Sequence, residues 1–222
     1  MPRGPLIMSR VLIATSNAGK LRDFAGAAGP LGVTIAGIPD FHLLPEVVED
    51  GLTFEANARK KAAEYSLRAP GELVLADDSG LEVDVLNGAP GVHSARYAAL
   101  EDLRGDGRSR PSGKADTANS PDPANNARLL CELASVAPER KIARFVCVLA
   151  AAREGEVLAV FSGKAEGLIL TAPRGTHGFG YDPLFFFPSL NKTFAELSEE
   201  EKALVSHRGA AFRKFLEWYR SR

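Results

Sequence analysis

Two adjacent carboxylates, Asp77 and Asp78, follow the apolar run Leu73–Ala76 and precede Ser79 and Gly80. A short apolar run of this kind is typical of a buried strand, so the carboxylates would stand at its C-terminal end, before a Ser-Gly turn. Adjacent ionised carboxylates repel one another and are costly to desolvate, which favours a neutralising cation such as a divalent metal. The alternative is a turn followed by a helix cap.

A second acidic group, Glu46, Glu49 and Asp50, lies in the loop-like stretch before a predicted helix. Magnesium bound to a nucleotide takes one or two protein carboxylates together with phosphate oxygens and water. One residue from each acidic segment is therefore sufficient for metal binding, and another carboxylate would orient or deprotonate an attacking water. Residue chemistry alone does not choose among the acids.

The segment Thr15–Lys20, TSNAGK, joins a predicted strand at Val11–Ala14 to a helical run that extends to Ala28. It is not a Walker A loop, which would need Gly in place of Ala14 and Ser or Thr in place of Leu21. Free backbone amides at a helix start and the charge of Lys20 would nevertheless suit a phosphate chain. The alternative is a polar turn with a solvated lysine.

Two later segments also carry residues suited to a ligand. The Gly-rich run 175–183 contains Phe179 and Tyr181, which would either stack on a planar ligand or pack in the core. Lys202, His207 and Arg208 lie around the start of the last predicted helix. Basic groups there oppose the helix dipole, so an anionic or acceptor-rich ligand is favoured.

The elements that must position these residues follow from periodicity. Apolar residues at helical spacing from Phe54 to Tyr65 predict an amphipathic helix, and a turn at Glu154-Gly155 predicts a hairpin between strands. Strands and helices alternate irregularly, which predicts an α/β fold with a mixed sheet. The remaining predicted elements are a strand at Val33–Gly37, a half-buried strand through Leu81, Val83 and Val85, a helix at Ala124–Val136, hairpin strands at Arg144–Ala152 and Val157–Ala165, a capping box at Ser198 and Glu201, and a last helix through Phe212, Phe215, Leu216 and Tyr219.

Composition restricts the class of protein. The 222 residues are 45% hydrophobic with a net charge of −1, which fits one globular unit and argues against a nucleic-acid partner. No apolar run is long enough to span a bilayer, and no signal peptide is evident, so we expect a cytoplasmic protein without a membrane partner. Both Cys131 and Cys147 are expected in the core. We predict a flexible leader at 1–9, a single domain at 10–222 and a mobile insertion at 101–126.

Seven motifs occur in the order found in the inosine triphosphate pyrophosphatase family, which this sequence resembles from about Arg10 to Leu216. Only the leader and the stretch near Asp102–Pro123 lie outside the resemblance. The motifs are TSNAGK, GLTFEANA, ADDSGLEVDVLNGAPGVHSARYA, ARFVCVLA, GFGYDPLFF, KTFAELSEEEK and SHRGAA.

The resemblance implies an elongated mixed-sheet fold with two lobes around a substrate cleft, usually a homodimer. It also implies Mg²⁺-dependent hydrolysis of non-standard purine nucleoside triphosphates (ITP, dITP, XTP) to the monophosphate and pyrophosphate. Glu49 and Asp78 would bind the metal, and Asp78 would also accept the proton, leaving Asp77 a supporting role. The implied substrate contacts are Thr15, Ser16, Asn17, Ala18, Gly19, Lys20, Ser79, Phe179, Gly180, Tyr181, Asp182, Lys202, His207 and Arg208.

Two other functions compete with this one. A nucleotide pyrophosphatase of the septum-formation-inhibitor type would share the fold but prefer other bases, and the SHR and FGYD motifs argue against it. A nucleotide-binding regulatory module without turnover would be expected to lack Asp78 or Lys20, and both are present. We further hypothesise that donors such as Arg208 select purines with a 6-keto acceptor, because adenine would leave those donors unpaired.

Overall fold

The computed structural model describes residues 10–28, 33–100 and 119–222. The main elements are β1 (Arg10–Ile13), α1 (Ala18–Ala28), β2 (Thr34–Gly37), α2 (Phe54–Ser66), β3 (Leu73–Val83), the 3₁₀ helix η4 (Gly91–Ala99), α3 (Asp122–Glu132), β4 (Ile142–Arg153), β5 (Glu156–Ile169), β6 (Phe185–Phe187), β7 (Lys192–Thr193), α4 (Glu199–Val205) and α5 (His207–Arg220). Short 3₁₀ helices are η2 (Phe41–Leu43), η3 (Asp84–Leu86), η5 (Pro138–Arg140), η6 (Pro188–Leu190) and η7 (Phe194–Glu196).

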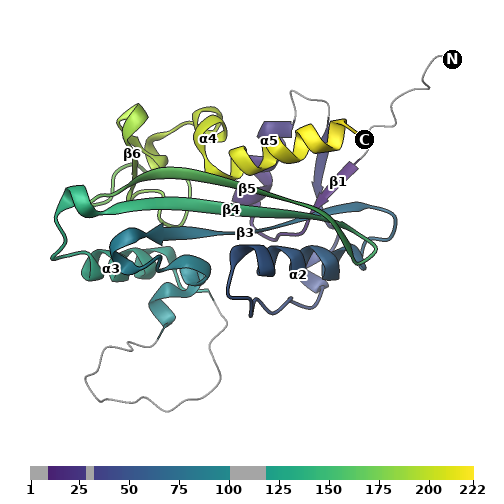
Figure 1. Cartoon of the computed structure of the whole chain (residues 1–222), viewed down its shortest axis with the longest axis horizontal. Coiled ribbons are helices and arrows are strands. Elements are labelled where there is room, and N and C mark those ends of the chain that lie inside the picture. The colour runs from purple at the N-terminus through teal and green to yellow at the C-terminus, as the bar shows by residue number, and fades with distance from the viewer. Residues whose placement is uncertain (1–9, 29–32, 101–118) are drawn as a thin grey trace, which may run out of the picture.

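One mixed sheet of seven strands organises the chain, in the order β2-β1-β3-β4-β5-β6-β7. β1 pairs in parallel with β2 and β3, whereas each pairing from β3 to β7 is antiparallel. The molecule is elongated along β3, β4 and β5, as Figure 1 shows. The predicted α/β class with a mixed sheet is confirmed.

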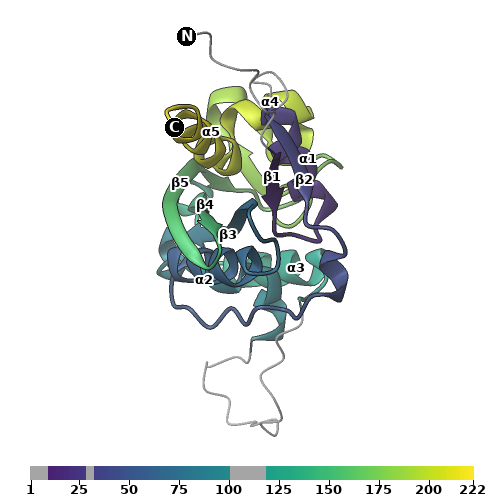
Figure 2. The ribbon, with the colours of Figure 1, turned by 90° about the vertical axis from the view of Figure 1, so that its right-hand side faces the viewer.

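Helices cover both faces of the sheet. α2 packs against β3 and β4 on one face, and α5 packs against β4 and β5 on the other, as Figures 1 and 2 show. Because successive strand residues point to opposite faces, Leu73 and Leu75 join the core under α1 and α5, whereas Val74 and Ala76 join the core under α2. We call the part of the molecule that contains these two cores the first lobe. A third apolar cluster, with residues from η4, α3 and 181–197, forms the second lobe.

The predicted Ser-Gly turn after Asp78 is wrong. β3 runs without interruption through Asp77, Asp78, Ser79 and Gly80, and each of these residues pairs with β4. β1 pairs with β3 only as far as Leu75, so the carboxylates stand in β3 where its other neighbour has ended. The separate strand expected through Val85 is also wrong, since β3 ends at Val83 and η3 follows.

Most other expected elements are confirmed with shifted ends. The β4–β5 hairpin turns at Glu154 and Gly155, both with positive φ (51° and 84°). The capping box of Ser198 and Glu201 begins α4, which is separate from α5. Cys147 is buried as expected, whereas Cys131 is exposed, contrary to expectation.

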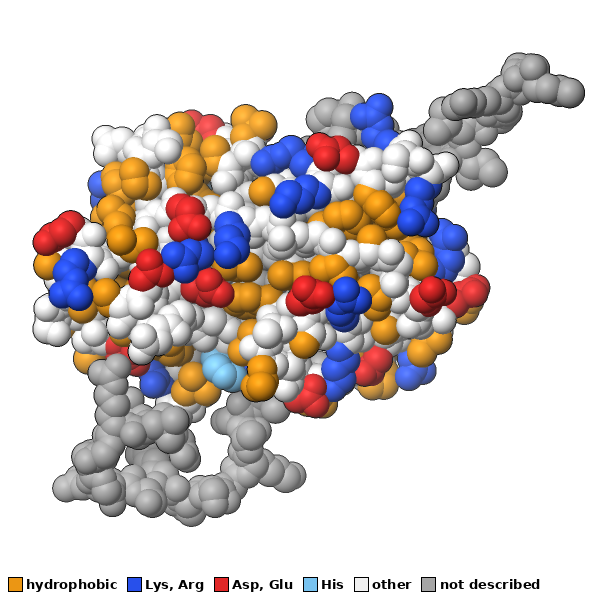
Figure 3. Space-filling view, viewed as in Figure 1, with side chains coloured by type: hydrophobic (Ala, Val, Ile, Leu, Met, Phe, Trp, Pro, Cys, Tyr) orange, Lys and Arg blue, Asp and Glu red, His pale blue; other side chains and the backbone are white. Residues whose placement is uncertain are grey.

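Helix α3 begins at Asp122, two residues before the predicted start, so residues 122–126 are helical although we assigned them to the insertion. Residues 101–118 of that prediction and the leader at 1–9 lie outside the described residues, and residues 119–121 are described without regular structure. Within the described ranges, no helix combines the length and apolar character needed to cross a bilayer. Figure 3 shows acidic and basic side chains interspersed over the face in view, with no field of one sign there.

Candidate functional site

A cleft of about 1930 Å³ runs between the two lobes. It receives side chains from the β1–α1 loop, the loop before α2, β3, η4, the Phe179 loop, α4 and α5. Its lining includes most of the predicted site residues: Thr15, Ser16, Asn17, Lys20, Glu49, Asp77, Asp78, Ser79, Phe179, Gly180, Tyr181, Asp182, Lys202, His207 and Arg208. Ala18 and Gly19 lie beside them in the first turn of α1.

Asp77 points to the α1 and α5 side of β3. Its carboxylate lies 2.9 Å from Lys20 Nζ and 3.8 Å from an Arg208 nitrogen, and it accepts a hydrogen bond of 2.5 Å from Ser79 Oγ. Burial raises the pKa of Asp77, but the charges of Lys20 and Arg208 outweigh this and hold the pKa well below its ordinary value. Asp77 is therefore an ionised group whose oxygens are committed to protein partners.

Asp78 points to the opposite side, toward α2. It accepts hydrogen bonds from Asn57 Nδ2 at 3.0 Å and from the Ser79 amide at 3.1 Å. Lys61 Nζ lies 3.7 Å from Asp78 and 2.5 Å from Glu49 Oε1. Burial raises the pKa of Asp78, and Glu49 raises it further, against the opposing effect of Lys61. Asp78 is thus the more basic of the adjacent pair.

The loop before α2 brings only one of its three acids to Asp78. Glu49 is half-buried and shares the Lys61 ammonium with Asp78, whereas Asp50 pairs with Lys60 at 2.8 Å and Glu46 is an exposed residue of the cleft wall. The geometry favours Glu49, as the family resemblance does.

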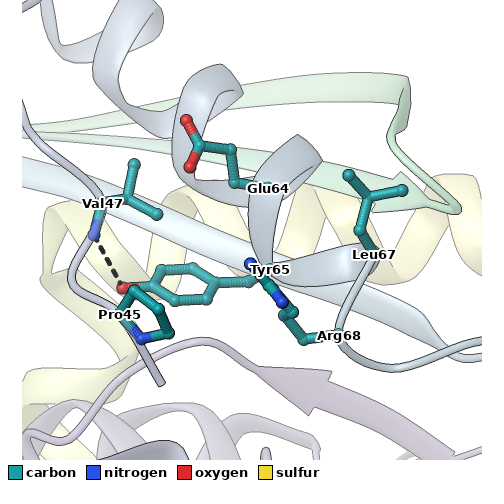
Figure 4. Close-up of a pocket in the computed structure, with 6 residues that line it drawn as sticks. All are labelled: Pro45, Val47, Glu64, Tyr65, Leu67 and Arg68. Atoms are coloured by element: carbon teal, nitrogen blue, oxygen red, sulfur yellow. Dashed lines mark hydrogen bonds between the residues drawn. The ribbon is translucent and has the colours of Figure 1, made fainter.

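Tyr65 of α2 contacts the loop that carries Glu49. Its hydroxyl accepts a hydrogen bond of 3.2 Å from the Val47 amide, as Figure 4 shows. The same two residues line a smaller pocket of about 350 Å³, together with Pro45, Glu64, Leu67 and Arg68. None of the predicted site residues lines this pocket, so we assign it no part in the chemistry.

The start of α1 differs from the expected set of free amides. Asn17 Oδ1 accepts hydrogen bonds from the amides of Gly19 and Lys20, at 2.8 and 3.2 Å, and Thr15 Oγ1 accepts one from the Asn17 amide. Asn17 therefore caps the helix in place of a ligand. The cationic group that this segment presents to the cleft is the side chain of Lys20.

The Phe179 loop divides its residues between the cleft and the core. Phe179 is half-buried, and its ring centroid lies 5.3 Å from Lys202 Nζ and 5.6 Å from Arg208 Cζ. Tyr181 is buried, and its hydroxyl donates to the Ser94 carbonyl at 2.9 Å. Asp182 is also buried and pairs with Lys202 at 2.5 Å. Packing therefore describes Tyr181 better than stacking on a ligand.

His207 and Arg208 are buried at the start of α5, although both line the cleft. The His207 ring stacks on Phe145 at 4.8 Å, and burial, with the nearby charge of Arg208, lowers its pKa well below the ordinary value. Arg208 pairs with Asp23 at 2.7 Å. Among the described residues, His207 Nδ1 and Arg208 Nε are buried without a hydrogen-bond partner, an arrangement that fits a ligand in the cleft that supplies one.

Three residues of this arrangement were missed by the sequence analysis. Asn57 and Lys61 lie one turn apart on α2 and both reach Asp78, and Asp23 of α1 holds Arg208. Lys61 is only 9% exposed although its side chain is charged. Its position gave no distinct signal, because a lysine beside an apolar stripe usually keeps its charged head in solvent.

The carboxylates fit a divalent cation. Glu49 and Asp78 converge on one ammonium group, that of Lys61, so positive charge is already accommodated at this point. Two oxygen ligands are what Mg²⁺ commonly takes from protein when phosphate and water complete its shell. Within the described ranges, no group of three or more His, Cys, Asp or Glu side chains could hold a metal without such help.

Comparisons with known proteins identify the family of this chain. Two curated proteins named dITP/XTP pyrophosphatase are similar: one from Geobacter sulfurreducens is 48% identical over 92% of this chain and 93% of its own, and one from Exiguobacterium sibiricum is 47% identical over 92% and 94%. The solved structure of a HAM1 protein from Coxiella burnetii has a TM-score of 0.77 at 34% identity, covering 96% of this chain and 100% of its own. That of the Staphylococcus aureus Ham1 protein has a TM-score of 0.73 at 37% identity, with coverages of 96% and 99%. The model of the Ham1 family matches residues 11–218, and the chain belongs to that family.

Proposed function

We propose that this protein hydrolyses non-standard purine nucleoside triphosphates, namely ITP, dITP and XTP, to the monophosphate and pyrophosphate. The observation that carries the proposal is the placement of Asp77 and Asp78 in one strand of the cleft, each facing its own lysine. Asp77 orients cations for the phosphates, and Asp78, held by Asn57 and the Ser79 amide, is the group that acts on water. The names of the similar curated proteins support the substrate class.

Lys20 and Arg208 supply positive charge on the Asp77 side of the strand. Asp77 fixes Lys20 at 2.9 Å, so the ammonium is oriented before a phosphate arrives. Ser16 and Ser79 add hydroxyl groups at the cleft wall. In this proposal Thr15 to Lys20 and Ser79 contact the triphosphate, and Asp77 holds these groups without touching the substrate.

Asp78 is the proposed proton acceptor for the attacking water. Its raised pKa improves its basicity, and Asn57 and the Ser79 amide fix the orientation of its carboxylate. Glu49 and Asp78 would together hold Mg²⁺. When bound, the ion supplies charge neutralisation at the phosphates and lowers the pKa of water.

The nucleoside would lie beside Phe179 and the start of α5. His207 is neutral because burial lowers its pKa, so its unpartnered Nδ1 is available to a base edge without adding charge. Arg208 Nε is a donor with no partner among the described residues, and it suits a 6-keto acceptor. Gly180, Asp182 and Lys202 would complete this wall, with Tyr181 in a supporting position.

We also propose a cytoplasmic homodimer and a single two-lobed domain. The three apolar clusters share strands β3 to β5, which supports one folding unit for the described residues. Size-exclusion chromatography with light scattering tests the dimer.

Pyrophosphate release from ITP, XTP, dITP, ATP, GTP and UTP, with and without Mg²⁺, tests the function. We expect turnover of the 6-keto substrates ITP, XTP and dITP, and much less of ATP and UTP. Guanine needs a separate exclusion through its 2-amino group. A protein that favoured UTP would support the septum-formation-inhibitor type instead, and one that bound ITP without turnover would support a regulatory module.

A further inference from the structure

Helix α3 holds the backbone of the Phe179 loop. Asp122 Oδ2 accepts a hydrogen bond of 2.6 Å from the Gly180 amide, and Asn126 Nδ2 donates one of 3.1 Å to the Gly180 carbonyl. Both polar groups of one residue are thus bound by side chains four positions apart on the same helix face. Gly180 has a φ of +63°, a conformation that glycine adopts without strain. We call this pair of side chains the α3 clamp.

The clamp acts on the residue next to the Phe179 ring. The Phe179 amide donates to Asp182 Oδ2 at 2.9 Å, so its backbone is held from the other side as well. A Cβ atom on Gly19 would lie 3.1 Å from the Phe179 ring, which places the ring against the start of α1. The Phe179 ring is in contact with α1, Lys202 and Arg208. A small rotation of the peptide between Phe179 and Gly180 would therefore move the ring away from these groups.

Helix α3 is itself anchored to η4. Asn125 is 2% exposed, accepts a hydrogen bond from the Ala98 amide at 2.8 Å and donates one to the Ala95 carbonyl at 3.1 Å. In η4, Ser94 Oγ accepts from the Leu81 amide of β3 at 2.9 Å. The clamp is therefore connected to the strand that carries Asp78, while Asp122 itself is exposed and contributes little packing.

We propose that Asp122 and Asn126 are positioning residues that hold Phe179 where it contacts the base. The inference rests on the proposed function, because it takes Phe179 as a nucleoside contact. The clamp bonds to Gly180, whereas Asp78 is held by Asn57 and the Ser79 amide, and stacking on the base is made equally before and during phosphate cleavage. Loss of the clamp therefore weakens substrate binding and leaves the chemical step unchanged.

Steady-state pyrophosphate release from ITP with Mg²⁺ tests this. For Asp122→Ala and Asn126→Ala we expect KM to rise about 5- to 20-fold with kcat within about 2-fold of the parent. Asp122→Asn keeps an acceptor oxygen and should recover most of the loss. Glu55→Ala is the matched control, because Glu55 is also an exposed acid in the first turn of a helix, and it should leave KM unchanged.

A double-mutant comparison identifies the route of the effect. In a Phe179→Ala background, Asp122→Ala should change KM less than about 2-fold, because the ring it positions is gone. A full additional effect there would overturn the proposal, as would equal losses in kcat and kcat/KM. Either result would mean that Asp122 acts by another route.

Amide hydrogen exchange gives a readout independent of turnover. Exchange across residues 178–183 should be faster in Asp122→Ala than in the parent or Glu55→Ala, because the Gly180 amide loses its acceptor. Unchanged exchange would overturn the positioning role whatever the kinetics. If instead the parent releases no pyrophosphate from ITP, the proposed function fails, while faster exchange would still support the clamp as the support of the loop.

Discussion

Substituting each of the adjacent carboxylates by its isosteric amide should give opposite phenotypes. Asp78→Asn removes the proposed proton acceptor and metal ligand, and Asp77→Asn removes the partner of Lys20 and Arg208. The two substitutions change the same chemical group at neighbouring positions, so each is the matched control of the other. The two variants differ only in the face of β3 on which a carboxylate charge is lost.

The magnitudes follow from the environments. For Asp78→Asn we expect a fall in kcat of about 10²- to 10⁴-fold, the usual contribution of a general base, or about 3–5.5 kcal/mol in the barrier. Its folded pKa is raised, so at pH 7 its charge opposes folding, and a neutral side chain should leave the free energy of unfolding within about 1 kcal/mol of the parent.

Asp77→Asn should instead destabilise the fold. The folded pKa of Asp77 is depressed, so its charge stabilises the protein above the ordinary carboxyl pKa and this contribution is lost as the pH falls through the folded pKa. Leaving a buried cation unpaired costs about 3–5 kcal/mol, and we reduce this to about 2–3 because Lys20 is 21% exposed and Arg208 keeps Asp23. For a chain of this size that lowers Tm by roughly 4–12 °C.

Thermal unfolding and pyrophosphate release from ITP, measured on the same preparations, decide between the outcomes. Turnover that survives Asp78→Asn would refute the assigned base. An inactive Asp77→Asn variant with an unchanged Tm would refute the assigned division between support and chemistry.

Three further predictions concern selectivity, pH and metal. Arg208→Ala should reduce the ITP over ATP preference in kcat/KM by about 5- to 150-fold, and an unchanged ratio would contradict the 6-keto account. Because His207 has a depressed folded pKa, its neutral form favours folding above pH 6.5 and stability is lost as the pH falls below that value, by up to about 1.4 kcal/mol per pH unit. His207→Gln should show a shallower decline of urea midpoint from pH 7 to 5, and parallel curves would count against the assignment. Chelation with EDTA should abolish turnover and Mg²⁺ should restore it; activity in EDTA would exclude an obligatory metal.

Periodic features were predictable from the sequence because packing imposes them. The stripe of α2 from Phe54 to Tyr65 is buried, and the β4–β5 hairpin turns where Glu154 and Gly155 interrupt the apolar runs. The capping box at Ser198 is likewise a local interaction, so no tertiary information is needed to find it.

Features set by distant contacts were not predictable. Ser79 and Gly80 favour a turn locally, but pairing with β4 along the whole of β3 overrides that preference. Asp23 meets Arg208 from 185 positions away, and Lys61 turns toward Asp78 only because β3 lies under α2. A local sequence pattern cannot show contacts between residues so far apart in the chain, so the residues that support the site were found only in the structure.

The alternation of Asp77 and Asp78 also constrains how the gene can change. Inserting or deleting one residue between Leu73 and Asp77 would move the two carboxylates to each other's faces, so that the buried partner of Lys20 and the basic group beside Glu49 would exchange places. The sheet would keep its outline while the reaction is lost. Insertions and deletions among homologous sequences should therefore occur in the loops between elements and be absent from the first half of β3.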